Sequence, residues 1–137
     1  MKRVTGIGGV FFKTKDTAKA KEWYAKHLGI PAGDYGHMFE WREKEKPENV
    51  ATTTWSPFAE KSDYFGNPDQ QYMVNYRVEN LVDLLVELKK EGVTIAGEMQ
   101  EFEYGKFAWI LDPDGNRIEL WEPVDQPLID FEEGEGK

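Results

Sequence analysis

The chain repeats one pattern of residues at an offset of 64 positions. A strand-like run over 9–16 precedes one helical run, and a similar run over 73–80 precedes another. Valine occupies positions 10 and 74, an aromatic ring occupies 12 and 76, and a base occupies 13 and 77. Asp16 and Asn80, also 64 apart, are good N-caps because their side chains accept hydrogen bonds from the first helical N–H groups. The repeat predicts two similar structural units in one chain.

Both helical runs carry apolar residues at the spacing of one helix face. In the second run leucine recurs at positions 81, 84, 85 and 88, which predicts a stripe packed against a sheet. In the first run the same spacing selects Ala20, Trp23, Tyr24 and Leu28. Gly29 and Gly92 follow the runs, as expected where a helix ends in the left-handed conformation.

Strand-like sequence follows each helical run. The candidate strands are 38–41 and 50–55 in the first half, and 98–104 and 107–121 in the second. This order predicts an α+β fold of two βαβββ modules, whose curved sheets enclose a cleft and whose helices lie outside. The segment 56–71 is expected to connect the two halves and to cover one end of the cleft.

Composition limits the chain to one domain. With 137 residues and 39% apolar content it can bury one core, so we assign 1–123 to a single domain, with module one at about 5–58 and module two at about 71–123. No run is long enough to span a membrane, and the start lacks the apolar segment of a secretory signal. The absence of cysteine removes disulfides and thiolate metal sites, so we expect a cytoplasmic protein.

The acidic charge balance argues against nucleic acid as a partner. The formal net charge is −9, whereas nucleic-acid phosphates require a basic face. Part of this charge lies at the end of the chain, where 125–137 holds five acids and one base. We expect the acidic C-terminal tail, 124–137, to carry no chemistry and to have a mobile end.

The segment 107–123, FAWILDPDGNRIELWEP, places an acid on a strand of large apolar residues. Proline, glycine and two aspartates at 112–115 predict a tight turn between two strands. Alternation along the second strand puts Glu119 and Trp121 on one face. A carboxylate beside an indole indicates either a solvent-facing strand or the wall of a pocket.

The two βαβββ units, the strand–Asp–helix opening and the closing DPDGNRIELWEP resemble the vicinal oxygen chelate superfamily over 6–123. That superfamily contains glyoxalase I, extradiol dioxygenases and bleomycin resistance proteins. The resemblance implies a divalent metal in the cleft, with ligands at the positions of Gly9, Met73 and Glu119 and an optional fourth near Thr54. Glycine offers no ligand and a thioether suits soft ions, so we expect no metal site and no cofactor. The alternative, a divalent metal held by His37 and Glu119, has no second histidine to support it; whether His37 or Glu40 reaches the cleft is left open.

Strand alternation selects the residues that would line the cleft. They are Phe11, Trp55, Met73, Asn75, Arg77, Trp109, Arg117 and Trp121, together with Glu119 as a candidate general base or polar anchor. Such a cleft suits an aromatic or cationic small molecule, because tryptophan faces attract cations. The alternative interpretation is structural: the aromatic residues form core, and Glu119 pairs with Arg77 or Arg117.

Two functions remain after these arguments. The first is a metal-free binding protein for an aromatic or cationic compound, as in bleomycin resistance. The second is a glyoxalase-like isomerase or lyase, or a dioxygenase-type enzyme, that uses Glu119 with an unrecognised metal site. The resemblance also implies a homodimer, and we expect no nucleic-acid or membrane partner.

Overall fold

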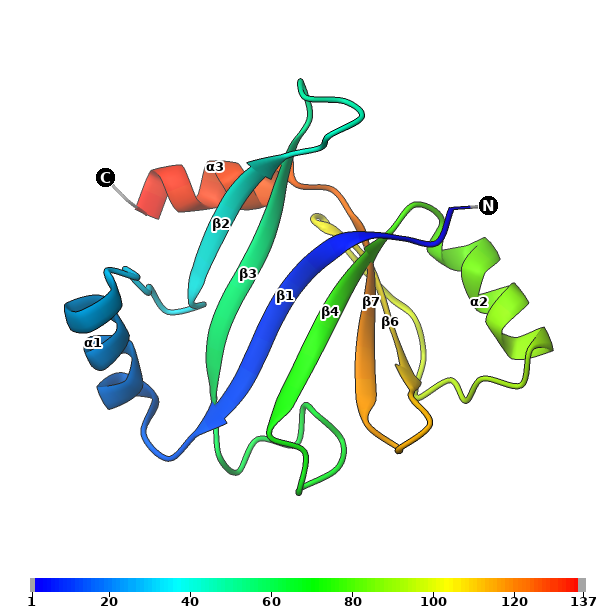
Figure 1. The fold of residues 1–137 in the computed structure, drawn as a ribbon, viewed down its shortest axis with the longest axis horizontal. Helices are drawn as coiled ribbons and strands as arrows, with labels where there is room; N and C mark the ends of the chain where they lie inside the picture. Colours follow the sequence, from blue (N-terminus) through cyan, green and yellow to red (C-terminus); the bar gives the residue numbers. More distant parts are fainter. Residues whose placement is uncertain (1, 136–137) are drawn as a thin grey trace.

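The structure is a computed structural model that describes residues 2–135, and it is an α+β fold as predicted (Figure 1). The first half contains β1 (Val4–Thr14), α1 (Thr17–Leu28), β2 (His37–Arg42) and β3 (Val50–Ala59). The second half contains β4 (Tyr72–Val78), α2 (Leu81–Lys90), β5 (Gln100–Phe102), β6 (Gly105–Leu111) and β7 (Arg117–Pro123). A further helix, α3 (Gln126–Glu135), follows within the segment predicted to be a tail.

The strands form one curved, open sheet in the order β2-β3-β1-β4-β7-β6-β5. β1 runs parallel to β3, and β4 runs parallel to β7. In each unit, a helix lies in the connection between the two parallel strands. Where the second unit has β5, the first has an isolated bridge between Gly33 and Gly36. The two modules therefore share the predicted plan, and the first has one strand fewer than the βαβββ pattern.

The two units join through their equivalent strands, β1 and β4. Val10 pairs with Val74, which is its own counterpart in the repeat. Gly9 pairs with Asn75 and Phe11 pairs with Met73, so the register is symmetric about the Val10–Val74 pair. This antiparallel seam makes the two module sheets continuous.

The predicted caps begin both helices. Asp16 accepts a hydrogen bond from the Lys19 N–H at 3.0 Å, and Asn80 accepts one from the Asp83 N–H at 3.3 Å. Gly29 and Gly92 have φ values of 70° and 85°, as predicted for glycines that end helices. These contacts satisfy backbone groups that a helix end leaves free.

The apolar stripe holds for α2 and only in part for α1. Leu81 and Leu84 are buried against Val78, Ala108 and Leu120 on one face of the sheet, which we call the outer face. On α1, Tyr24 packs against the outer-face residues Phe12 and Trp55. Trp23 and Leu28, however, are 53% and 60% exposed, because α1 lies beside the sheet edge rather than across it (Figure 1).

The opposite face of the sheet, the inner face, carries Phe11, Met73, Asn75, Trp109 and Glu119. The segment 60–71 crosses this face and inserts Phe65, which is fully buried in a cluster with Phe11, Met73 and Trp109. The predicted covering of one end of the cleft is therefore confirmed.

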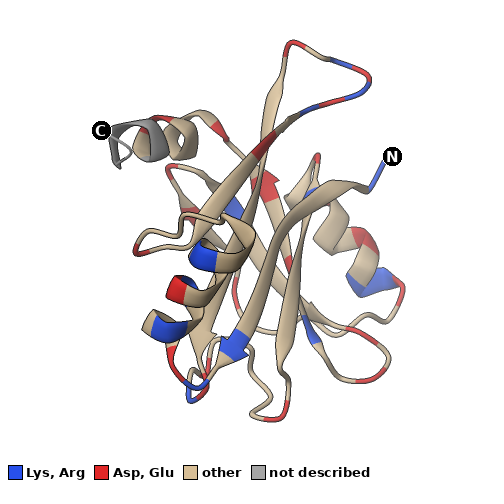
Figure 2. Cartoon of the chain, turned by 60° about the vertical axis from the view of Figure 1, so that its left-hand side comes forward, with Lys and Arg blue, Asp and Glu red and all other residues tan. Residues whose placement is uncertain are grey.

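The acidic tail is structured where the structure describes it. α3 packs Ile129 into the protein, with 7% of that residue exposed, and residues 136–137 lie outside the described residues. No helix among the described residues is long and apolar enough to cross a membrane. Charged residues lie mostly on the helices and loops, as Figure 2 shows.

Candidate functional site

Glu119 lies in the middle of the inner face and is only 2% exposed. Its Oε1 accepts a hydrogen bond from Asn75 Nδ2 at 2.6 Å. Its Oε2 accepts from Trp109 Nε1 at 2.9 Å and also from the hydroxyl of Tyr64. Three neutral donors therefore hold this carboxylate, which satisfies most of the hydrogen-bonding demand of a buried anion.

Strand register brings these donors together. Asn75 on β4 and Trp109 on β6 both pair with Glu119, so the three side chains stand side by side on the inner face. Tyr64 arrives from the connecting segment, where it stacks on Phe58 with ring centroids 5.5 Å apart. Burial raises the pKa of the Tyr64 hydroxyl, and the nearby Glu119 charge raises it further. The hydroxyl is therefore held in its protonated, donating form.

The positions of the family metal ligands do not form a metal site here. At Gly9 a Cβ would lie 2.8 Å from the Phe11 ring, so that ring fills the space of a ligand side chain. Met73 is buried in the apolar cluster, and both oxygens of Glu119 already accept hydrogen bonds. Within residues 2–135, no group of three or more His, Cys, Asp or Glu residues is arranged to hold a metal ion.

The register also corrects one position in the alignment of the two units. Glu119 pairs with Asn75, and Ser56 pairs with Phe11, the counterpart of Asn75 in the repeat. The counterpart of Glu119 is therefore Ser56, two residues beyond the predicted Thr54. Neither residue is an acid, so the conclusion about the metal does not change.

The alternative interpretation, in which Glu119 pairs with an arginine, does not agree with the described contacts. Arg77 makes a two-pronged ion pair with Asp125, with both N–O distances at 2.7 Å. Arg117 donates from Nη1 to the backbone carbonyl of Tyr64 at 3.2 Å. Both arginines start on the inner face, as predicted, but neither reaches the Glu119 carboxylate among the described contacts.

The Arg77 side chain extends along the inner face, past Gly8 and between the indole rings of Trp41 and Trp121. Its guanidinium carbon lies 5.4 Å from the Trp41 ring centroid and 5.1 Å from that of Trp121. A Cβ at Gly8 would lie 2.9 Å from the Trp121 ring and 3.0 Å from Arg77 Cγ, so this crossing requires glycine there. Trp121 also stacks on Phe107, with ring planes 11° apart.

Trp55 is the one predicted lining residue that the structure places on the other face. It contacts Phe12 and Tyr24 on the outer face, with ring centroids 5.4 and 4.9 Å apart. The strand register explains this placement: Trp55 pairs with Val10, whose side chain lies on the face opposite to that of Phe11. The remaining predicted residues, Phe11, Met73, Asn75, Arg77, Trp109 and Trp121, are inner-face residues and are buried.

An open cavity of about 870 Å³ lies toward β2, and neither Glu119 nor its three donors are among the residues that line it; its wall residue Tyr104 accepts a hydrogen bond from Trp121, the neighbour of Glu119 on the inner face. Its floor includes Met38 and Thr54, which pair across β2 and β3. Its walls come from the loop before β2, the turn between β5 and β6, and α3, which supply chiefly Tyr35, His37, Glu103, Tyr104, Leu128 and Phe131. His37 lines this cavity, but its ring lies against Phe39 of the outer face, with ring centroids 4.8 Å apart; Glu40 is exposed and does not line the cavity.

The Glu119 charge acts on this cavity. Burial raises the pKa of the Tyr104 hydroxyl, and the Glu119 carboxylate adds to that increase, followed by Tyr35. Among the described contacts, the three groups that donate to Glu119 are neutral, and none is a cation. A bound molecule would meet a negative potential from that side.

Replacing Glu119 with glutamine is expected to lower the free energy of unfolding by about 1–3 kcal/mol. The amide keeps the shape but turns one acceptor oxygen into a donor, so either Asn75 or the pair of Trp109 and Tyr64 faces a donor in place of its acceptor. Urea denaturation followed by tryptophan fluorescence measures the change. Glu101→Gln, an exposed acid on β5, is the matched control, and equal stability of the two variants would show that the carboxylate is not held as described.

Sequence reasoning missed Tyr64, Tyr104 and Phe131 because no strand alternation marks residues in loops and in a segment assigned to a tail. The aromatic content of 60–71 was the available signal for Tyr64. For Asp125, its position directly after Pro123-Val124, at the end of a strand, was the only sign of a structural role.

Comparisons with known proteins agree with this architecture. A family described as the Glyoxalase/Bleomycin resistance protein/Dioxygenase superfamily matches residues 6–120. None of the curated proteins compared with the chain matches it in sequence.

Solved structures share the fold at low sequence identity. Methylmalonyl-CoA epimerase from Mycobacterium tuberculosis matches with a TM-score of 0.62 and 20% identity, over 94% of this chain and 95% of that one. A Streptomyces coelicolor methylmalonyl-CoA epimerase variant in complex with 2-nitronate-propionyl-CoA gives a TM-score of 0.63 and 10% identity, over 88% and 99%. A Legionella pneumophila structure described as an NAD-dependent benzaldehyde dehydrogenase gives 0.54 and 15%, over 85% and 98%.

Proposed function

Because the chain belongs to the glyoxalase/bleomycin resistance protein/dioxygenase superfamily, we propose that it binds a small aromatic cation in the cavity beside Glu119, without the metal centre of its enzymatic relatives. The observation that carries this proposal is the cavity itself. Its volume of about 870 Å³ lies within the ordinary range for small-molecule sites. Three aromatic side chains, Tyr35, Tyr104 and Phe131, line it together with aliphatic residues.

The charge distribution supports a cationic ligand. Glu103 lies in the wall, and the Glu119 charge reaches Tyr104 without a paired cation in between. Aromatic faces attract cations within about 6 Å of the ring centroid. An anionic ligand such as an acyl-CoA, which carries several phosphate charges, is disfavoured by the same groups and by the net charge of −9.

Catalysis by an isomerase or lyase mechanism is the less supported alternative. It requires Glu119 to accept a proton from a substrate, yet this residue is 2% exposed and Tyr64, Asn75 and Trp109 donate to its two oxygens. A substrate would have to displace at least one of those donors. A ligand can bind in the open cavity without displacing any of these donors.

Three acridines of equal ring size test the proposal. At neutral pH 9-aminoacridine is a cation, acridine is neutral and acridine-9-carboxylate is an anion. We expect 9-aminoacridine to raise the melting temperature most and the carboxylate least, because at equal concentration a ligand that binds only the folded state stabilises it more the lower its Kd. Phe131→Ala should weaken the effect, and Tyr72→Ala, an exposed outer-face ring, should not.

Two results would overturn the proposal. One is stabilisation by zinc or manganese with none by any acridine, which would favour a metal enzyme. The other is equal stabilisation by all three acridines, which would show that charge plays no part in recognition.

A further inference from the structure

α3 closes one side of the cavity, and a single residue ties the beginning of this helix to the sheet. Pro127, Leu128 and Phe131 of α3 line the cavity. Asp125, directly before the helix, accepts hydrogen bonds from Leu128 and Ile129 N–H groups through its backbone carbonyl. The position of the cavity wall therefore depends on where Asp125 is held.

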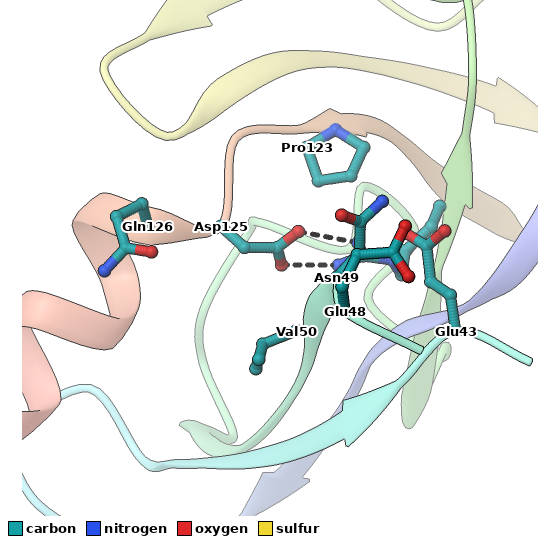
Figure 3. A pocket seen from close by; sticks show the side chains of 8 residues that line it. Glu43, Glu48, Asn49, Val50, Pro123, Asp125 and Gln126 are labelled. Atoms are coloured by element: carbon teal, nitrogen blue, oxygen red, sulfur yellow. Dashed lines mark hydrogen bonds and ion pairs between the residues drawn. The ribbon is translucent and has the colours of Figure 1, made fainter. Parts of the chain in front are cut away.

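The Asp125 carboxylate has an unusually complete set of partners. Its Oδ1 accepts from Arg77 Nη1 at 2.7 Å, from Thr52 Oγ1 at 2.8 Å and from the Thr52 N–H at 3.1 Å. Its Oδ2 accepts from Arg77 Nη2 at 2.7 Å. Figure 3 shows a second pocket, of about 420 Å³, with Asp125 at the bend into α3 and dashed lines from its two carboxylate oxygens that mark the bonds to Arg77.

The partners of Asp125 are themselves fixed. The Arg77 side chain is 3% exposed and lies between two indole rings, and Thr52 is fully buried on β3. Among the ion pairs of the described residues, this is the one in which both side chains are mostly buried, at 3% and 15% exposure. Both units of the fold thus contribute an anchor, Thr52 from the first and Arg77 from the second.

The facing wall is tied to the same region. The Tyr104 carbonyl accepts hydrogen bonds from the Val124 N–H at 3.0 Å and from Trp121 Nε1 at 2.9 Å. The cavity residue Tyr104 is therefore bonded to the two chain positions that lead into Asp125. On the far side, Phe131 contacts Tyr35 at 5.8 Å between ring centroids.

From these contacts we infer that the Arg77–Asp125 pair is a latch that positions α3 as a wall of the ligand site, so that α3 docking and ligand binding stabilise each other. Asp125 is in this sense a positioning residue and does not touch the ligand. The inference rests on the proposed binding function. Its thermodynamic consequence is reciprocal: a bound molecule should stabilise the docked position of α3, and a weakened latch should lower the affinity for the molecule.

The first test compares two variants that each remove one negative charge, one directly before α3 and one within it. Asp125→Asn breaks the two-pronged pair, whereas Asp130→Asn removes an equal charge from an exposed position on α3. We expect 9-aminoacridine to dissociate about tenfold faster from Asp125→Asn in stopped-flow fluorescence, since most affinity changes appear in the dissociation rate. Dissociation from Asp130→Asn should match that of the unchanged protein. Equal dissociation rates for all three proteins would overturn the inference.

Hydrogen exchange keeps the test independent of folding defects in a variant. In the unchanged protein, 9-aminoacridine should slow the exchange of the amides of 128–131, and no slowing there would contradict the coupling. Arg77→Lys, which keeps the charge but cannot form two parallel bonds, should speed both α3 exchange and ligand release.

Failure of the binding proposal gives a different pattern. The unchanged protein would then bind no acridine, while Asp125→Asn would still speed the exchange of α3 amides relative to Asp130→Asn. If α3 amides exchange equally in both variants, the latch itself is refuted.

Discussion

Replacing Phe65 with alanine is expected to lower the free energy of unfolding by about 3–5 kcal/mol, the usual cost of emptying a large buried aromatic site. Phe65 is 0% exposed and lies in the inner-face cluster with Phe11, Met73 and Trp109. Within the segment 60–71, Phe65 supplies the buried apolar contact with the sheet, while Gln70 bonds to the backbone of Arg117. Without the ring, Tyr64 should also lose its approach to Glu119.

Urea denaturation monitored by tryptophan fluorescence measures the loss, and Phe39→Ala is the matched control because Phe39 is 45% exposed on the outer face. A control loss near zero and a Phe65 loss of several kcal/mol would confirm the packing. A loss below about 1 kcal/mol for Phe65→Ala would mean that the segment does not seal this end of the inner face.

Replacing Arg77 with methionine is expected to cost about 3 kcal/mol of unfolding free energy, because it leaves the Asp125 carboxylate without its counter-charge. The lower end of the range for broken buried pairs applies, since Asp125 keeps 15% exposure and water can reach it. The double variant Arg77→Met/Asp125→Leu removes both charges, and should recover much of this loss.

A double-mutant cycle with Asp125→Leu alone gives the coupling energy of the pair. Strongly non-additive losses would confirm that the two side chains act as a unit. Additive losses would show that Arg77 stabilises the fold through its two indole neighbours and not through Asp125.

The elements that sequence reasoning predicted well are those in which local chemistry and periodicity agree. Asp16, Asn80, Gly29 and Gly92 mark helix ends by backbone and capping chemistry that does not depend on the rest of the fold. The alternation along β7 placed Glu119 and Trp121 on one buried face. The repeat supplied the plan of two similar units, whereas the order of the strands in the sheet comes from the structure alone.

The site was predicted less completely because its partners come from segments without periodicity. Glu119 was correctly placed on the same sheet face as Trp121, but it is buried and does not line the cavity, and its partners are the neutral donors Tyr64, Asn75 and Trp109 rather than an arginine. Which of several possible donors meets a buried acid depends on strand register and loop course. Neither can be read from side-chain types alone.

Trp55 shows that an error of one residue in the alternation along a strand assigns a side chain to the wrong face. A shift of one residue along a strand moves a side chain to the opposite face, so the strand was predicted correctly and its last tryptophan was assigned to the wrong side. Arg77 lies on the predicted face, but its long side chain reaches Asp125, which belongs to the acidic tail that was expected to carry no chemistry.

The pairing of Val10 with Val74 has a consequence for the ancestry of this architecture. Two separate copies of one half-length chain, meeting about a twofold axis, would pair the same strand with itself in this register. The internal seam is therefore the geometry of a dimer of half-chains, made permanent by the linker 60–71. Fusion frees the copies to diverge, and here one copy has glycine and serine where the other has Met73 and Glu119. The two similar halves now hold a single buried carboxylate, away from the Val10–Val74 pair, and the cavity lies to one side.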